Sequence, residues 1–223
     1  MTLSLQHVHP WQVTTREAIA IQDRLARLVN DGPLTGAPRT VAGVDVSVRG
    51  DRVQAAVVVL RLPDLSLLDQ AIWRGPVQFP YVPGLLSFRE APAVLAALDK
   101  IRVWPDLIMT DSQGRAHPRR FGLACHIGVL LDQPCIGVAK SKLVGNFSEP
   151  GPLKGDSSAL LHGDEEIGTV LRTRDGIKPL FVSVGHKVSL PQAVDLTLAC
   201  CTRYKIPEPT RQAHLLSRRL DLS

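Results

Sequence analysis

Three runs rich in valine, isoleucine and leucine follow one another between residues 40 and 73, with very little sequence between them. They span Thr40–Val48, Val53–Leu62 and Leu65–Trp73. Aliphatic and β-branched residues in short runs are typical of strands. The turn-forming segments Arg49–Asp51 and Pro63-Asp64 separate the runs. Connections this short cannot hold a crossover helix, so the pattern predicts three consecutive antiparallel strands in one sheet.

Further along the chain, strand-like and helix-like segments alternate. Leu107–Thr110 and Cys135–Ala139 have the short, apolar character of buried parallel strands. Gly168–Arg172 and Leu180–Val184 predict a hairpin. Periodicity, capping residues and prolines predict helices over 15–30, 87–103, 118–131, 191–203 and 209–220. The predicted fold class is therefore α/β, with a single mixed β-sheet flanked by helices.

The length and composition suit one globular domain spanning residues 1–223, and two domains are possible but not required. No apolar run approaches the length of a membrane span, and Met1–Trp11 lacks the features of a signal peptide. We therefore expect a cytoplasmic protein without a membrane partner. Four cysteines without C-x-x-C spacing are expected to be reduced and mostly buried: Cys125, Cys135, Cys200 and Cys201.

The net charge of +5 favours a polyanionic partner such as a nucleic acid. The basic residues gather in three places along the chain. These are Arg115, Arg119 and Arg120; Lys140 and Lys142; and Arg211, Arg218 and Arg219. Each group taken singly is equally consistent with an ordinary solvated basic face.

Three carboxylates stand where structural roles do not readily explain them. Asp45 interrupts a strand-like run, and burial of a lone carboxylate there would be costly. Asp111 follows a buried strand, at the end where open α/β sheets place their ligands. With Glu90 they could form a hard oxygen site suited to Mg²⁺ or Mn²⁺. For each acid alone, a helix cap or a structural salt bridge remains the alternative.

The segment Pro80–Glu90 (PYVPGLLSFRE) presents an aromatic side chain on a stiff loop. Pro80 and Pro83 restrict the backbone on either side of Tyr81, and Gly84 allows a tight turn after them. Such a loop suits contact with a bulky ligand. The alternative is a stiff connector whose tyrosine is buried.

Three further segments carry polar side chains towards the same sheet edge. After Asp111 comes a glycine-containing turn and a predicted helix with His117, Arg119 and Arg120, which together suit an anion. Lys140 directly follows a predicted strand and could hold a water or a phosphate, or form a structural ion pair. His214, near the start of the last predicted helix, could reach a metal or simply lie on the surface.

Taken together, these segments resemble the endonuclease V family of deoxyinosine-specific repair nucleases. The matching runs are VAGVDVS (41–47), PYVPGLLSFRE (80–90), DSQGRAHPRRFGLACHIG (111–128), GVAKSKLVG (137–145) and PTRQAH (209–214). The resemblance implies a ribonuclease H-like fold and a Mg²⁺-dependent endonuclease, with Mn²⁺ able to substitute. It also implies hydrolysis of the second phosphodiester bond 3′ to a deaminated purine, leaving 3′-hydroxyl and 5′-phosphate ends.

The resemblance also implies roles for individual residues. Asp45, Glu90 and Asp111 would be metal ligands, and Lys140 and His214 would complete the catalytic group. Pro80, Tyr81, Val82 and Pro83 would form a wedge between the DNA strands. The extruded base would enter a pocket built by Gly84, Leu86, Ser112, Gly114, His117, Gly122, Gly137 and Leu143. Arg119, Arg120 and Lys142 would contact phosphates.

One position departs from the family pattern, because Ser112 stands where a glycine is usual. Its hydroxyl could tighten the pocket or change its hydrogen bonding. The expected partner is DNA containing deoxyinosine, with inosine-containing RNA as a further candidate, and the expected state is a monomer. Two alternatives remain: another ribonuclease H-like nuclease acting on hybrids or junctions, and a lesion-binding module that has lost its chemistry.

Overall fold

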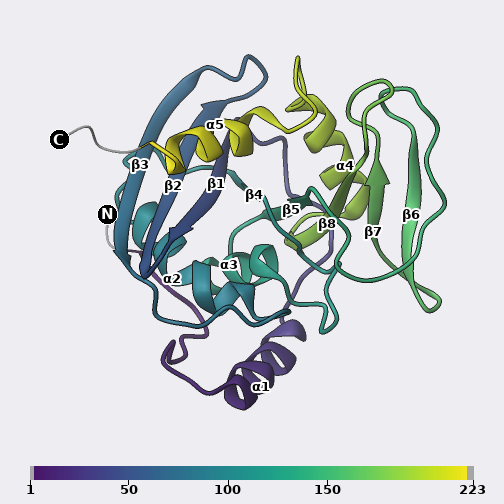
Figure 1. Cartoon of the computed structure of the whole chain (residues 1–223). Coiled ribbons are helices and arrows are strands. Elements are labelled where there is room, and N and C mark those ends of the chain that lie inside the picture. Colours follow the sequence, from purple (N-terminus) through teal and green to yellow (C-terminus); the bar gives the residue numbers. More distant parts are fainter. Residues whose placement is uncertain (1–2, 220–223) are drawn as a thin grey trace.

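An eight-stranded mixed sheet forms the centre of the molecule (Figure 1), in a computed structural model that describes residues 3–219. The strand order is β3-β2-β1-β4-β5-β8-β7-β6. The strands are β1 (Thr40–Arg49), β2 (Arg52–Arg61), β3 (Leu67–Pro76), β4 (Leu107–Thr110), β5 (Cys135–Ala139), β6 (Ser157–His162), β7 (Glu165–Leu171) and β8 (Leu180–His186). β1, β2 and β3 pair antiparallel in chain order, which confirms the predicted meander.

Four of the five helices in residues 3–219 cover the two faces of this sheet, and the first helix packs on the third instead (Figure 1). The five helices are α1 (Thr15–Ala26), α2 (Leu86–Leu98), α3 (Leu123–Leu131), α4 (Leu190–Ala199) and α5 (Glu208–Ser217). β1 and β4 pair in parallel, as do β4 and β5, so the carboxyl ends of these three strands point the same way. No helix among residues 3–219 has the length and apolar character needed to cross a membrane.

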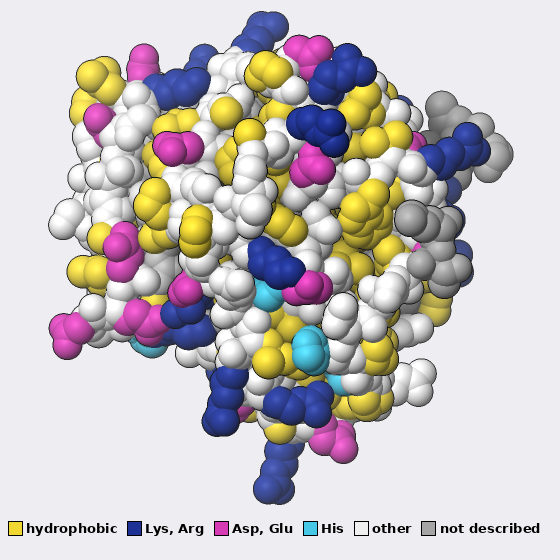
Figure 2. All heavy atoms as spheres, turned by 180° about the vertical axis from the view of Figure 1, so that it is seen from behind, with side chains coloured by type: hydrophobic (Ala, Val, Ile, Leu, Met, Phe, Trp, Pro, Cys, Tyr) yellow, Lys and Arg dark blue, Asp and Glu magenta, His cyan; other side chains and the backbone are white. Residues whose placement is uncertain are grey.

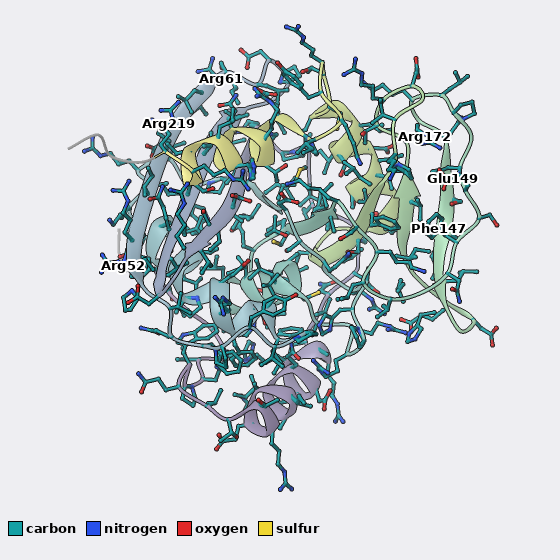
Figure 3. All side chains as sticks on the ribbon, viewed as in Figure 1. Arg52, Arg61, Phe147, Glu149, Arg172 and Arg219 are labelled. Carbon is teal, nitrogen blue, oxygen red and sulfur yellow. The ribbon has the colours of Figure 1, made fainter. Side chains whose placement is uncertain are left out.

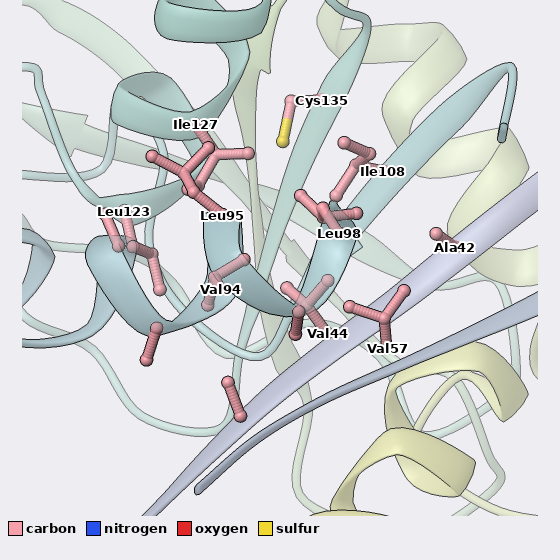
Figure 4. Close-up of a cluster of buried hydrophobic side chains, with 14 of the residues drawn as sticks. Ala42, Val44, Val57, Val94, Leu95, Leu98, Ile108, Leu123, Ile127 and Cys135 are labelled. Atoms are coloured by element: carbon pink, nitrogen blue, oxygen red, sulfur yellow. The ribbon is translucent and has the colours of Figure 1, made fainter. Parts of the chain in front are cut away.

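Alternating residues of the strands supply two separate cores. Ala42 and Val44 of β1 pack with Val94 and Leu98 of α2, and Figure 4 shows this cluster between the sheet and its helices. Val41 packs on the opposite face, in a cluster that also holds residues of α4 and α5. This period of two places α2 and α3 on one face of the sheet and α4 and α5 on the other.

The helix predicted from Pro118 is wrong in its start, because α3 begins only at Leu123. Arg120 adopts a φ of 55°, which a right-handed helix cannot contain. The backbone N–H of Gly122 instead donates to the carbonyl of Gly114, and that of Ala124 donates to Gln113. Residues 112–122 therefore form a folded loop, and the predicted helix positions of His117, Arg119 and Arg120 are corrected to this loop.

Two other boundaries also differ from the prediction, and one strand was not predicted. α2 ends at Leu98 and α4 at Ala199, each a few residues before the predicted end. β6 was not predicted, because its alternating exposed residues carry no apolar run. The buried Arg172 holds the segment before β6 in place by donating hydrogen bonds to Glu149 and Gly151, and it also donates to Ile177. Figure 3 labels Arg172 and Glu149 beside this strand.

Candidate active site

Two aspartates and a histidine from three separate elements meet just beyond the end of β4. The parallel register between β1 and β4 pairs Val44 with Thr110. The next residues of the two strands, Asp45 and Asp111, therefore lie at the same level. His214 of α5 joins them, and one ligand atom from each of the three lies within 4.8 Å of the others. We call these three residues the acid cluster, and their donor set suits a divalent cation.

Helix α5 contributes a second contact to this cluster. His214 Nδ1 lies 3.3 Å from Asp45 Oδ2, and the Ser217 hydroxyl donates to the same oxygen at 2.5 Å. α5 can approach β1 this closely because Gly43 has no side chain, since a Cβ there would lie 2.0 Å from the Pro209 carbonyl. Ser217 is not a predicted site residue. Its position one helical turn after His214 is the only signal for it in the sequence.

Glu90 reaches the same region from α2, which packs on the opposite face of the sheet. It lines a cavity of about 80 Å³ together with Asp45 and Asp111, and apolar side chains form most of the remaining wall. Burial and the two nearby aspartates raise the pKa of Glu90 to about 8, while Arg89 opposes the shift. A bound cation would offset the repulsion between Glu90 and the two aspartates, and it would favour the ionised form of Glu90.

Lys140 follows β5 and forms an ion pair with Asp111. Burial raises the pKa of Asp111, and the ammonium of Lys140 opposes that shift. The predicted position of the lysine at this sheet edge is therefore confirmed. The geometry agrees both with a structural ion pair and with an ammonium held beside reacting groups.

A larger cavity of about 380 Å³ adjoins the acid cluster. Asp111 and Lys140 line it on one side, and the 80–90 loop lines it on the other. Its volume falls within the range of roughly 300–1,000 Å³ that small-molecule sites occupy. The predicted pocket and wedge residues that line it are Tyr81, Val82, Pro83, Gly84, Leu86, Ser112, His117, Gly122 and Leu143.

Two predicted pocket residues lie behind this wall instead of on it. A Cβ on Gly137 would lie 2.4 Å from the backbone nitrogen of Gly114. A Cβ on Gly114 would in turn lie 2.1 Å from the Val184 carbonyl. These glycines allow the 111–122 loop to pack directly on the sheet, so they shape the cavity without lining it.

Tyr81 is 70% exposed at the rim of the larger cavity. The alternative prediction of a connector with a buried tyrosine is therefore wrong. Pro80 is exposed as well, but it does not line the cavity. The loop thus presents its aromatic ring to solvent beside the opening.

Three donors converge on the backbone carbonyl of Gly84, which has a φ of 76°. Arg119 Nη2 donates at 2.6 Å, His117 Nε2 at 3.0 Å and Gln22 Nε2 at 3.1 Å. We call this arrangement the Gly84 clamp. Burial, with the positive charge of Arg119, lowers the pKa of His117 to about 4, so its ring is neutral at pH 7. Gln22, a buried residue of α1, was not predicted because nothing local marks it.

The three predicted phosphate contacts lie in different surroundings. Arg119 belongs to the Gly84 clamp, and its Nε also donates to Gln22. Arg120 forms an ion pair with Glu165 and lies 3.0 Å from His162. Lys142 is exposed, with its ammonium 5.8 Å from the ring centre of Phe147. Figure 2 shows one face of the molecule, on which basic, acidic and apolar side chains are interspersed.

Ser112 lines the larger cavity, but its hydroxyl is already engaged. The Ser112 and Thr110 hydroxyl oxygens lie 2.7 Å apart, and the Thr110 hydroxyl also donates to the Ile136 carbonyl at 3.4 Å. The serine that departs from the family pattern is thus tied to the end of β4. Its hydroxyl hydrogen is used within the protein.

Comparison with known proteins identifies close relatives over nearly the whole chain. The family model described as Endonuclease V matches residues 23–215. The chain is 50% identical over 220 residues to the Endonuclease V of Alkalilimnicola ehrlichii, with 97% of each chain covered.

Two solved structures are similar to this chain. The crystal structure of the Endonuclease V from Streptomyces avermitilis has a TM-score of 0.90 and 47% identity, covering 98% of this chain and 97% of its own. The second is Endonuclease V from Ciona intestinalis in complex with a 24mer DNA containing an inosine followed by a ribo-adenosine. It has a TM-score of 0.80 and 28% identity, and the match covers 91% of this chain and 95% of its own. With the mixed sheet and its flanking helices, these similarities confirm the predicted ribonuclease H-like fold.

Proposed function

The chain belongs to the endonuclease V family of nucleases, and we propose that it cuts DNA containing a deaminated purine, with deoxyinosine as the main lesion. The cut would fall at the second phosphodiester bond 3′ to the lesion and leave 3′-hydroxyl and 5′-phosphate ends. Inosine-containing RNA is a further candidate substrate. The Ciona intestinalis relative in complex with inosine-containing DNA supports this choice of lesion.

One observation carries the proposal more than any other. Asp111 lines both the larger cavity and the small cavity that holds Asp45 and Glu90. A base held in the first would therefore place its own backbone close to the group suited to bind a cation. This arrangement joins recognition of the base to cutting of the strand, which neither cavity would explain alone.

The residues of the acid cluster fit a hard divalent cation, and Glu90, whose pKa is raised by burial and by the nearby aspartates, lies beside them. We propose that Asp45, Glu90 and Asp111 hold Mg²⁺, with His214 beside them, and that Mn²⁺ can substitute. Bound there, the ion would lower the pKa of a water and stabilise charge on the phosphate. Lys140, already paired with Asp111, would orient the scissile phosphate or the attacking water.

Base recognition would use the exposed loop and the larger cavity. Tyr81 would fill the space that the extruded base leaves, with Pro80, Val82 and Pro83 keeping the loop stiff. Extrusion costs a few kcal/mol and less for a weakly paired base, so pairing strength itself contributes to selectivity. Lys142 is the exposed cation among the three proposed phosphate contacts, whereas Arg119 and Arg120 have protein partners.

A nicking assay with mapped cut positions tests this function. The substrates are single-stranded DNA, duplex DNA, RNA and an RNA–DNA hybrid, each with and without one inosine, in Mg²⁺ or in EDTA. We expect the wild type to nick the inosine-containing substrates at one position 3′ to inosine, in Mg²⁺ and not in EDTA. Cutting of an undamaged RNA–DNA hybrid at a comparable rate would favour the alternative nuclease.

Two substitutions separate cutting from binding. Asp45→Ala and Lys140→Gln should reduce the nicking rate by about 100-fold or more, since each removes a charge beside the reacting phosphate. Binding to inosine-containing DNA, measured by fluorescence anisotropy, should persist in both. A wild type that binds this DNA but never nicks it, in Mg²⁺ or Mn²⁺, would identify a binding module without chemistry.

A further inference from the structure

Two residues that line the larger cavity each carry a buried side-chain atom without a hydrogen-bond partner. The atoms are Gln113 Oε1 and Ser87 Oγ, on residues that are 8% and 2% exposed. A buried polar atom without a partner costs about 1–3 kcal/mol, so such atoms call for an explanation. Only one other atom of this kind occurs among the described residues, His126 Nδ1, and it does not line the cavity.

The orientation of the Gln113 amide is fixed by its other half. Gln113 Nε2 donates to the Ser141 carbonyl at 2.8 Å, and a carbonyl can only accept. The free atom is therefore the oxygen, which can accept a hydrogen bond but cannot donate one. Ser141 follows Lys140 and Gln113 follows Ser112, so the amide also ties together the two loops that carry Lys140 and Asp111.

The other obvious acceptors around the cavity are already in use. The Gly84 carbonyl accepts three hydrogen bonds in the Gly84 clamp, and the Ser141 carbonyl accepts the Gln113 amide. The Ser112 hydroxyl is bonded to Thr110. Gln113 Oε1 is thus an amide oxygen in the cavity wall that has no partner, and the Ser87 hydroxyl and the Asp111 carboxylate are the further side-chain acceptors there.

We propose that Gln113 determines base specificity by accepting a hydrogen bond from the ring N1–H of the extruded purine. This inference rests on the proposed function. Hypoxanthine carries a hydrogen on N1, whereas N1 of adenine is an acceptor and would face Oε1 with like partial charge. The unpartnered Ser87 hydroxyl gives the same cavity a donor, which suits the carbonyl of a lactam base.

The test changes both partners of the proposed hydrogen bond. Single-stranded oligonucleotides, which remove differences in pairing strength, carry hypoxanthine, N1-methylhypoxanthine or adenine at one position. Nicking rates are measured for the wild type and for Gln113→Met, which keeps the length of the side chain and removes the acceptor. We expect the wild type to prefer hypoxanthine over each other base by tenfold or more, and the variant to lose about tenfold on hypoxanthine alone.

The ratio of rates on hypoxanthine and N1-methylhypoxanthine decides the outcome. Its decrease towards one in Gln113→Met supports the proposal. An equal loss on all bases would overturn it, because Gln113 would then only hold the two loops in place. Gln133→Met is the matched control, since Gln133 is a half-buried glutamine that donates to Pro105 and Asp106 carbonyls outside the cavity; its ratio should equal that of the wild type.

Failure of the proposed function is distinguishable from failure of this inference. A wild type that cuts none of the three oligonucleotides contradicts the function itself. A wild type that cuts hypoxanthine selectively, with a Gln113→Met variant of unchanged selectivity, contradicts only the role of Gln113.

Discussion

His117 shows how a single neutral side chain holds the loop beside the larger cavity. Its Nε2–H donates to the Gly84 carbonyl, and its Nδ1 accepts from the backbone N–H of Arg119 at 3.2 Å. The second of these bonds requires the neutral ring, because a protonated imidazole has no acceptor. The neighbouring guanidinium and the burial of the ring both favour this form.

Protonation of His117 should therefore destabilise the fold. Its pKa lies near 4 in the folded chain and near its ordinary value of 6.5 in the unfolded chain, so the unfolded state binds more protons between these values. We expect this group to remove of the order of 1–3 kcal/mol from the free energy of unfolding as the pH falls from about 6.5 to about 4.

Urea unfolding at several pH values measures this effect. His117→Gln, which keeps a donor and an acceptor but cannot be protonated, should lose less stability over the same interval than the wild type. His7→Gln changes an exposed histidine and should follow the wild type. Identical pH dependence in wild type and His117→Gln would contradict the role given to the neutral ring.

At the scale of elements, the contact between α5 and β1 brings together two of the three residues of the acid cluster, Asp45 and His214. Gly43 leaves room for the backbone of Pro209, and this proximity brings His214 and Ser217 to Asp45. The contact at Gly43 is with the backbone of Pro209, which cannot move aside as a flexible side chain can. α5 could therefore not stay this close to β1 if residue 43 carried a side chain.

A methyl group at position 43 should push α5 away from the sheet. We expect Gly43→Ala to cost about 1–3 kcal/mol in stability, as overpacking typically does, and to weaken metal binding as well. Thermal unfolding and titration calorimetry with Mn²⁺ measure the two effects. Gly50→Asn is the control, since that turn glycine has open space around it and Asn tolerates its φ of 58°. If Gly43→Ala bound Mn²⁺ as tightly as this control does, the prediction would be contradicted.

In the proposed function, the segment 80–90 separates contact with DNA from contact with the metal. Tyr81 is exposed at the cavity rim, whereas Glu90 lies in the small cavity. Tyr81→Ala should weaken binding to inosine-containing DNA by about 1–3 kcal/mol, the usual value of one aromatic stacking contact, and leave Mn²⁺ affinity unchanged. Anisotropy and calorimetry give the two values, and an equal loss in both would exclude a wedge role.

Sequence reasoning identified the elements whose signals are local. The β1–β3 meander follows from short apolar runs and tight turns, and Asp111 and Lys140 follow from strand ends. It failed where distant partners decide, as in the loop before α3, where Pro118 resembles a helix start but the backbone bonds back to residues 113 and 114. Gln22, Ser217 and the Gln113 amide were missed for the same reason, because each contacts a partner far away in the chain.

At the scale of the whole molecule, one continuous sheet links both cores. Residues of β1, β2, β4 and β5 contribute to the cluster on each face, so neither face can lose its packing alone. We predict a single cooperative unfolding transition, as a single domain requires. Tryptophan fluorescence, which reports Trp11 and Trp73 beside the first core together with the exposed Trp104, should coincide with far-ultraviolet circular dichroism.

The β6–β7 hairpin gives the strictest test of a single unfolding transition, because it lies at the edge of the sheet and has its own small core. Its salt bridges from Glu165 to Arg115 and Arg120 connect it to the loop before α3. Backbone amide exchange in β7 should therefore require nearly the full free energy of unfolding. Exchange through a separate, easier opening would show that the hairpin is an independent unit.

The hydrogen bond between Ser217 and Asp45 joins residues 172 positions apart, and it has a consequence for the order of events during synthesis. β1 leaves the ribosome well before α5. A growing chain can therefore form much of the sheet and its Asp45–Asp111 pair while His214 and Ser217 are still missing. The proposed cutting activity should appear only after α5 has been synthesised, so that chains without this helix cannot damage nucleic acid nearby.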